Sequence, residues 1–518
     1  MDIQQLKLSA ELVRDLLKAC DVRIGHSQAL DLVAALPGLR NWPEVLAFPD
    51  RVSACTVDAF SVARLAGRLC DKYGVDLLSP EVLLRVLISD ERLRSVGTRA
   101  PVDFSTYLTV QEVCSAPTAL QAHQRFAENL DVLKDWQIIY ADQQDVGTVK
   151  LLNLQLGNSG LAATVFRGRS LWIMDAPFVA SGSSAKVDLR GGSALFVDSN
   201  AASYVRAMAY QAEPQDRVIQ NARLMNKLGS RLQNLNFYLY LWEAQRHWSP
   251  KTRARCKESV AAIHALSASG SPLSLEWGNR YRCAFREQAE NFAEGLISEF
   301  EQDLDAGLAQ GIAQQVAMME AILVRAQIIQ LSSKKSPQHK LALLVAFMHE
   351  ELSTMMLREL VVCGDLFSKS ENSRMAQKLN SLQNHPNPEA LLRNCAWDMF
   401  IPRALDMLAA SRPAHTEQLD FYLAELLTFD GDVCDILRAT QLRAIALHRP
   451  SMRPMPFYDN DVAEWLGNRV GDKRMAELDE FFQPSASKQR SERRSVKAVQ
   501  DVLQEDWSHL LHLLKRAA

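Results

Sequence analysis

Several features that identify common protein classes are missing from this sequence of 518 residues. Its nine cysteines are scattered and form no Cys-x-x-Cys pair, which disfavours a disulfide framework or a zinc site and is typical of reduced thiols. No apolar run reaches the roughly 18 residues that a membrane-spanning helix needs. The first residues lack the basic-then-apolar order of a signal peptide. We therefore expect a cytoplasmic protein with no membrane partner.

Charge and the common catalytic motifs also argue against several classes. The chain has 58 Lys and Arg against 61 Asp and Glu, so its net charge is only −3 and any basic surface must be local. No Gly-x-Gly-x-x-Gly sequence opens a helix, and no phosphate-binding loop has the required spacing. The segment that begins at His349 resembles the start of a zinc-protease motif but lacks the second histidine.

The pattern of apolar residues and turns divides the chain into four predicted parts. Residues 1–105 are predicted to form a helical module, and residues 106–190 a small β-containing region of short strands split by Gly, Asn and Asp. Residues 191–482 are predicted to form an α/β domain, which a helical insertion interrupts at about 255–385. Residues 483–518 are predicted to be a linker and a last helix. The expected fold class is mixed α/β and α-rich.

Residues 24–47 contain His-Ser-x-Ala-Leu, then an apolar helical pattern and Asn-Trp before a leucine. This segment resembles the short helical module at the start of bacterial glyoxalase-related proteins. It carries no catalytic residue that can be assigned, so we expect it to dock or pack. Glyoxalase-like metal chemistry would rest on this module alone, and the sequence shows no paired His and Glu ligands on β-strands to support it.

Two short apolar runs each end in an aspartate and are followed by a helical segment. The run at 194–197 leads into Asp198, and the run at 426–429 leads into Asp430. Such a run is too short for a helix and predicts a buried strand with a carboxylate at its carboxyl end, where open α/β sheets place their sites. The alternative is that each aspartate only caps the next helix, and Asn would then replace Asp198 with little effect.

A third aspartate, Asp398, is predicted to open a helix. Three motifs together resemble the PIN-domain nucleases in their order and local context. They are a strand that ends in Asp-Ser-Asn, a later helical Asp, and then Leu-Leu-Thr-x-Asp. The resemblance implies a doubly wound parallel sheet with acidic residues that hold Mg²⁺ or Mn²⁺ and hydrolyse RNA. It covers roughly residues 192–250 and 390–450, so the helical segment between them is the implied insertion.

The resemblance assigns a role to each matching residue. The implied catalytic acids and metal ligands are Asp198, Glu243, Asp398 and Asp430, with Glu350 or Glu351 as the alternative to Glu243. The residues implied to position them are Asn200, Thr428 and Asp432. Carboxylate oxygens suit a hard divalent cation, which lowers the pKa of a bound water that can attack a phosphodiester.

Residues 246–257 contain five Lys or Arg and no acid. Basic residues with an interleaved aromatic suit phosphate binding and base stacking. The nucleic-acid contacts predicted in this basic segment are Arg246, Trp248, Lys251, Arg253 and Arg255. The alternative is a solvated helix face.

The sequence leads to the hypothesis of a metal-dependent endoribonuclease that acts on RNA or on single-stranded nucleic acid. A regulated toxin or defence effector is the setting that fold-level analogy suggests. The alternative function is a non-catalytic interaction scaffold with a degenerate PIN-like core. In either case the helical regions offer surfaces for a protein partner or a second copy of the chain.

Overall fold

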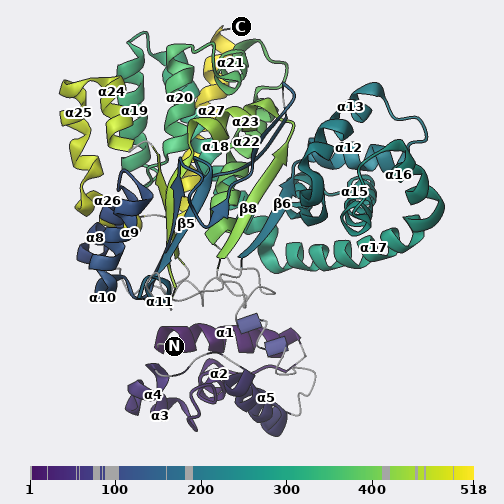
Figure 1. The fold of residues 1–518 in the computed structure, drawn as a ribbon. Coiled ribbons are helices and arrows are strands. Elements are labelled where there is room, and N and C mark those ends of the chain that lie inside the picture. Colours follow the sequence, from purple (N-terminus) through teal and green to yellow (C-terminus); the bar gives the residue numbers. More distant parts are fainter. Residues whose placement is uncertain are drawn as a thin grey trace. The chain divides into compact units, whose positions relative to one another are not determined.

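The computed structural model shows the chain as two compact units, residues 1–110 with 448–453 and residues 111–447 with 454–518, each described here by itself (Figure 1). The structure describes residues 3–19, 22–53, 55, 57, 59–73, 82–83, 86–87, 104–158, 160–180, 191–410, 421–449, 453–459, 462–493 and 495–517.

Helices form the described part of the first unit, as predicted for the amino-terminal module. Their bounds are α1 Ile3–Ala19, α2 His26–Val33, α3 Trp42–Ala47, α4 Pro49–Ser53 and α5 Ala59–Tyr73. Asn41 caps α3 by accepting a hydrogen bond from the Glu44 amide at 3.0 Å. Arg64 and Arg68 of α5 donate to backbone carbonyls at the end of α2 and in the turn after it. These contacts hold the helices around a small apolar core.

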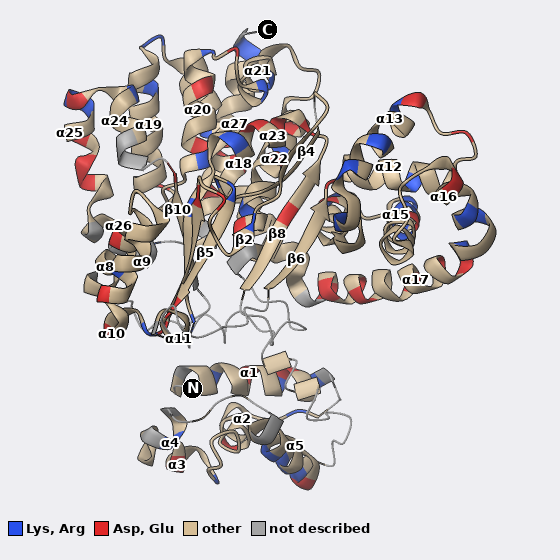
Figure 2. Ribbon diagram, in the orientation of Figure 1, with Lys and Arg blue, Asp and Glu red and all other residues tan. Residues whose placement is uncertain are grey.

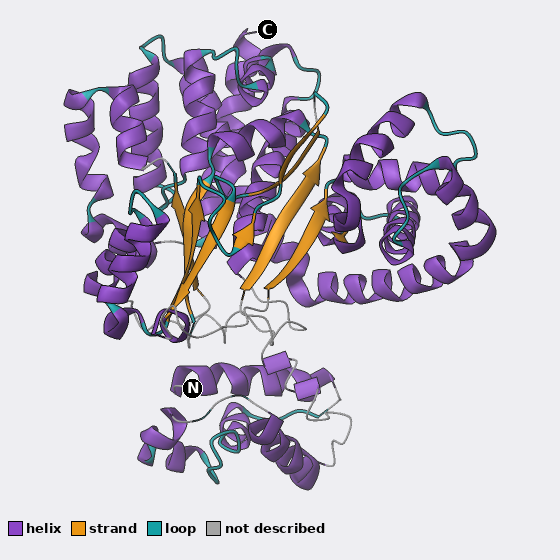
Figure 3. Cartoon of the chain, viewed as in Figure 1, coloured by secondary structure: helices purple, strands orange, loops and turns teal. Residues whose placement is uncertain are grey.

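The second unit contains two five-stranded sheets, and Figure 3 shows their strands among the helices. The antiparallel sheet has the order β10-β9-β1-β5-β2, and the mixed sheet has the order β3-β4-β8-β6-β7. The bounds are β1 Trp136–Asp142, β2 Val149–Lys150, β3 Asn153–Leu156, β4 Gly160–Thr164, β5 Ser170–Asp175, β6 Gly191–Val197, β7 Leu235–Asn236, β8 Phe421–Thr428, β9 Leu442–His448 and β10 Arg453–Tyr458. The mixed α/β, α-rich class is thus confirmed.

The mixed sheet is parallel only in part. Strand β6 runs parallel to β7 and to β8, whereas β4 pairs with β8 antiparallel and β3 pairs with β4 antiparallel. The predicted doubly wound parallel sheet is therefore not what the structure shows. The physical reason is that β1–β5, predicted as a separate small β region, supply strands to both sheets, and the β3–β4 hairpin pairs with the edge of β8 that faces away from β6.

Strands β6 and β8 are aligned so that their carboxyl ends meet. Gly191 lies opposite Phe421 and Val197 lies opposite Leu427. A Cβ atom on Gly191 would clash with the Phe421 ring, so a larger residue here would displace that side chain. The register brings the residues that follow the two strands, Asp198 and Asp430, to the same edge of the sheet.

Both faces of the mixed sheet are covered by helices, as the alternation of side chains along a strand requires. Ala194 and Phe196 belong to one core with residues of α18–α22 and α27, and Leu195 and Val197 belong to the other core with residues of α12–α17. Figure 1 shows the helices α12, α13, α15, α16 and α17 grouped beside β6.

The connection from β7 to β8 is helical, as the predicted insertion requires. Among the described residues from 237 to 410 there is no strand. Its helices are α14 Tyr238–Ala244, α15 Pro250–Ser269, α16 Leu275–Arg280, α17 Arg286–Asp303, α18 Ala309–Ser332, α19 Pro337–Glu350, α20 Leu357–Ser368, α21 Arg374–Asn380 and α22 Pro388–Ala410. Of the helices the structure describes, α18 alone is long and apolar enough to cross a membrane, and most of it is buried inside the protein.

The remaining helices belong to the second unit, except that α8 begins at a residue of the first unit. They are α8 Phe104–Cys114, α9 Ala119–Glu128, α10 Leu130–Leu133, α11 Ala176–Ala180, α12 Ser199–Tyr210, α13 Asp216–Met225, α23 Gly431–Ala439, α24 Val462–Val470, α25 Asp472–Leu478, α26 Pro484–Arg493 and α27 Val496–Ala517. The last helix was predicted. Residues 484–493, predicted as a linker, instead form α26.

Candidate acidic site

Asp198 joins the ends of β6 and β8. Its side chain is only 3% exposed. One carboxylate oxygen accepts a hydrogen bond from the Ala201 amide at 2.6 Å and so caps α12. The other oxygen accepts from the Thr428 hydroxyl at 2.6 Å and from the Phe429 amide at 3.1 Å. Asp198 is therefore both the strand-end carboxylate and the helix cap that the sequence presented as alternatives.

Thr428 continues this connection to Asp430. Its hydroxyl oxygen accepts a hydrogen bond from the Asp430 amide at 2.9 Å while the hydroxyl donates to Asp198. Asp430 caps α23 by accepting from the amides of Asp432 at 2.8 Å and Val433 at 3.4 Å. The residues at and after the end of β8 thus position the carboxylates of Asp430 and Asp432 and donate hydrogen bonds to that of Asp198.

Glu243 comes from α14, the helix that follows β7. Its carboxylate accepts a hydrogen bond from the Ser199 hydroxyl at 3.2 Å, so α14 is held to the first residue of α12. Glu243 also interacts electrostatically with Asp198 and Asp430. Glu351, in contrast, pairs with Arg325 at 3.0 Å, and Glu350 is exposed at the end of α19.

Asp398 lies in the interior of α22 and does not open a helix as predicted. The helix begins earlier, because Asn387 accepts a hydrogen bond from the Ala390 amide at 3.0 Å and Pro388 occupies the first helical position. The sequence Asn-Pro-Glu at 387–389 was the start signal that we overlooked. Asp398 interacts electrostatically with Asp430 and Asp432, so it still joins the cluster from the side of α22.

We call Asp198, Glu243, Asp398, Asp430 and Asp432 the acidic cluster. Two cations lie beside it. Lys378 of α21 pairs with Asp398 at 3.2 Å and with Asp432 at 3.0 Å. Arg246 donates to Asn394 at 3.0 Å, lies 5.3 Å from the Trp397 ring centroid, and interacts electrostatically with Glu243 and Asp398. Asn200, predicted to position the metal, is exposed on α12.

Burial and mutual repulsion raise the pKa values of three of these acids. Burial raises the pKa of Asp198 to about 6, and its three hydrogen bonds and Asp430 act on it more weakly. Burial, then Asp198, raises the pKa of Glu243 to about 7. Burial raises the pKa of Asp398 to about 8 despite the neighbouring Lys378. Ionising all of them together is therefore unfavourable without a compensating cation.

The chemistry of this donor set fits a hard divalent cation such as Mg²⁺ or Mn²⁺. Among the described residues, Lys378 pairs with two of the five carboxylates and Arg246 interacts electrostatically with two, so the negative charge of the cluster exceeds the positive charge of these two side chains. The oxygens are not already gathered as ligands, because within the described residues no three His, Cys, Asp or Glu side chains are arranged to hold a metal ion. The residues that would hold the cation are those of the acidic cluster.

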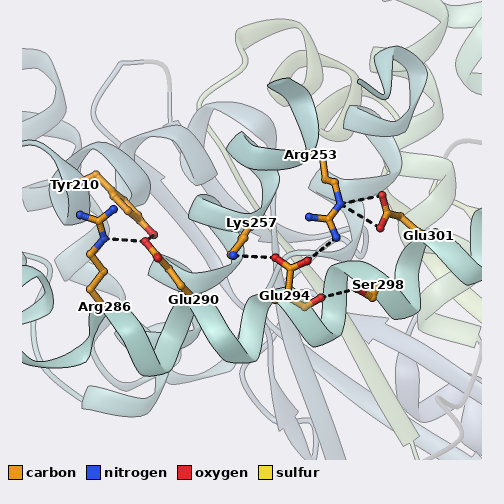
Figure 4. Close-up of polar contacts among 8 residues, drawn as sticks. All are labelled: Tyr210, Arg253, Lys257, Arg286, Glu290, Glu294, Ser298 and Glu301. Carbon is orange, nitrogen blue, oxygen red and sulfur yellow. Dashed lines mark hydrogen bonds and ion pairs between the residues drawn. The ribbon is translucent and has the colours of Figure 1, made fainter. Parts of the chain in front are cut away.

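The basic segment is partly neutralised by acids of α17, as Figure 4 shows. Arg253 pairs with Glu294 at 2.7 Å and with Glu301 at 3.0 Å, and Lys257 pairs with Glu294 at 2.8 Å. The Trp248 indole also donates to Glu301 at 3.1 Å. Figure 2 shows several acidic residues, in red, along α17. Lys251 and Arg255 are exposed, and their predicted contact with nucleic acid stays a prediction.

Comparison of the chain with protein-family models, with curated proteins and with solved structures found no match.

The contacts of Asp198 predict that Asp198→Asn destabilises the protein by about 1–3 kcal/mol near pH 8. An amide group can accept on one side only, so its NH₂ would face either the Ala201 or the Phe429 amide. Thr118→Asn, at the exposed cap of α9, is the matched control and should change stability by less than about 0.5 kcal/mol. Equal effects of the two changes in urea denaturation would show that Asp198 is only a cap.

The raised pKa values predict that the acidic cluster costs stability as the pH rises. Asp198, Glu243 and Asp398 are protonated in the folded and unfolded states at low pH. Between about pH 5 and pH 9 the folded protein must ionise groups that the unfolded chain ionises near 4, so this part of the stability is lost as the pH passes 6 to 8. Glu243→Gln should therefore gain about 1–2 kcal/mol relative to the parent between pH 5 and pH 9.

The comparison with a control variant isolates this effect. His264, His339 and His349 have lowered pKa values, chiefly through burial, and contribute in the opposite direction in both proteins. Glu350→Gln changes an exposed glutamate that acts on His349, so it should lack the gain expected of Glu243→Gln. If Glu243→Gln follows the parent in denaturation curves from pH 5 to pH 9, Glu243 is not held among ionising neighbours.

Proposed function

We propose that this protein is a metal-dependent endoribonuclease that cleaves phosphodiester bonds at the acidic cluster. The observation that carries this proposal is the convergence of acids from distant parts of the sequence. Asp198 and Asp430 follow the parallel strands β6 and β8, and Glu243 of α14 and Asp398 of α22 interact electrostatically with acids at these strand ends. In open α/β sheets the ligand site lies beyond the carboxyl ends of parallel strands.

The chain's own residues orient and hold the carboxylates. Thr428 fixes Asp198, and Ser199 fixes Glu243, each through a hydroxyl hydrogen bond. Asp430 is oriented by the amides at the start of α23. A bound Mg²⁺ or Mn²⁺ would lower the pKa of a water molecule and would polarise the phosphoryl oxygen. No histidine base and no serine nucleophile is needed for such chemistry.

The parallel strands β7-β6-β8, with helices on both faces, support a PIN-like interpretation of this part of the chain. The antiparallel β4 and β3 would then be an elaboration of that core, and α15–α21 the helical insertion. RNA is the substrate that the resemblance implies. Arg246 beside the cluster, with the exposed Lys251 and Arg255, gives cationic groups for its phosphates.

A non-catalytic scaffold is the second candidate, and one observation favours it. Lys378 pairs with two acids of the cluster, and the described carboxylates are not arranged as ligands. An ammonium that permanently neutralises Asp398 and Asp432 would make the cluster a structural ion network, and the helices would then bind protein partners. The two functions differ in whether the protein binds a divalent cation.

We expect the purified protein to cleave RNA with Mg²⁺ or Mn²⁺ and to lose this activity with a chelator. Glu243→Gln keeps the shape of the side chain and its acceptor for Ser199, and it should lower the rate at least about 10–100-fold. Glu350→Gln, which changes an exposed glutamate outside the cluster, should keep most of the rate. Gel assays on RNA and on single-stranded DNA measure both. Cleavage that depends on Glu350 but not on Glu243 would contradict the assignment.

The basic segment allows a separate test on RNA binding. Changing Lys251 and Arg255 to Gln should lower the slope of binding affinity against salt by about one for each lost phosphate contact. Arg253→Gln should have a smaller effect on the slope, because Glu294 and Glu301 already neutralise this side chain. Binding titrations at several salt concentrations measure this slope. An unchanged slope in the double variant would show that Lys251 and Arg255 are only solvated surface residues.

A further inference from the structure

Lys378 is the one cation that is paired directly with acids of the cluster among the residues the structure describes. Its ammonium lies 3.2 Å from the carboxylate of Asp398 and 3.0 Å from that of Asp432. Its side chain is 33% exposed, whereas those of Asp398 and Asp432 are 15% and 14% exposed. A solvent-borne anion can reach the ammonium more easily than it can reach the carboxylates.

The helix that carries Lys378 is held firmly. Ser373 caps α21 by accepting from the Ala376 amide at 3.2 Å, and Met375 and Leu379 are buried in the core. The buried Gln327 of α18 donates to the Leu379 carbonyl at 2.8 Å. The backbone of α21 is thus fixed at both ends, and only the flexible stem of Lys378 can reorient.

A second cation on the same face of α21 contacts the start of α23. Arg374, one turn before Lys378, lies so close to Gly431 that a Cβ atom there would clash with its guanidinium group. Its side chain is 51% exposed and pairs with Asp435 at 3.8 Å. Arg374 and Lys378 therefore present positive charge at the edge of the acidic cluster, beside Gly431 and Asp432, the first two residues of α23.

The charge balance of the cluster indicates that Lys378 can exchange its ion pairs with Asp398 and Asp432 for a contact with another anion. One ammonium serves two carboxylates, and the other three acids of the cluster have hydrogen bonds but no direct ion pair among the described contacts. A partly exposed lysine pair contributes modestly to stability and is weakened by salt. A group with three N–H donors on a flexible stem binds a phosphate oxygen as readily as a carboxylate.

We propose that Lys378 is the phosphate-binding residue of this site. In the metal-free protein its ammonium neutralises Asp398 and Asp432. In the active enzyme it releases these carboxylates and donates to a non-bridging oxygen of the scissile phosphate. The proposal rests on the proposed function, because it assumes that the acidic cluster takes up a divalent cation and cleaves a phosphodiester.

Two measurements on Lys378→Met and Lys378→Arg test this role. The first is the affinity for Mn²⁺ without nucleic acid, measured by calorimetry at low salt. Lys378→Met should bind Mn²⁺ about threefold or more tightly than the parent, because no ammonium competes for Asp398 and Asp432. The second is the single-turnover cleavage of RNA at saturating Mn²⁺. Lys378→Met should be slower by about 100-fold, and Lys378→Arg should recover part of the rate.

The matched control is Lys473→Met, which removes the same charge from the exposed face of α25. It should leave both measurements unchanged. A merely structural Lys378 would lower Mn²⁺ affinity and cleavage together, so opposite changes in the two measurements support the proposal.

Three outcomes would overturn it. Unchanged or weaker Mn²⁺ binding by Lys378→Met would show that the ammonium does not occupy the cation site. Tighter Mn²⁺ binding with undiminished cleavage would make Lys378 a competitor and not a phosphate ligand. If the parent protein binds no Mn²⁺ and cleaves no RNA, the proposed function itself is wrong. If the parent and Lys378→Met cleave RNA at equal rates, only the role of Lys378 is wrong.

Discussion

The hydrogen bonds that join Asp198 to Thr428 and Phe429 are the interactions on which the rest of the site depends. They connect residues 230 and 231 positions apart in the sequence and tie the end of β6 to the end of β8. Because Asp198 also caps α12 and Thr428 also accepts from the Asp430 amide, one small network orients the start of two helices.

The electrostatic cost of the site follows from that geometry. Two strands and two helices deliver buried carboxylates to one place, and burial raises the pKa values of Asp198, Glu243 and Asp398. A folded protein retains such an arrangement when positive charge compensates it. Lys378 and Arg246 supply part of that charge from within the chain. The remaining imbalance is the physical basis for proposing a divalent cation.

The local features of the site could be predicted from the sequence, and the long-range ones could not. The runs before Asp198 and Asp430 are short, apolar and followed by helical segments, so β6 and β8 were predicted, and the parallel arrangement brings the two aspartates together. Lys378 was missed because it lies on a seven-residue helix and meets Asp398 and Asp432 only through tertiary packing.

The same dependence on tertiary packing explains the other differences between the sequence-based predictions and the structure. The hairpin pattern of β3 and β4 indicated strands but not that they would pair with β8. The basic segment looked unopposed because Glu294 and Glu301 lie 41 and 48 residues from Arg253 in the sequence and meet it only when α17 packs on α15. Local periodicity indicates elements, whereas pairing between elements depends on the complete core.

The measurement that tests the central claim most directly is the anomalous scattering of Mn²⁺ in crystals of the protein grown or soaked with this ion. A peak at the acidic cluster, bonded to oxygens of at least two of Asp198, Glu243, Asp398 and Asp430, is the predicted result. A structure in which Mn²⁺ is absent from the cluster at a concentration that fills other sites, and in which Lys378 still pairs with Asp398 and Asp432, would contradict it.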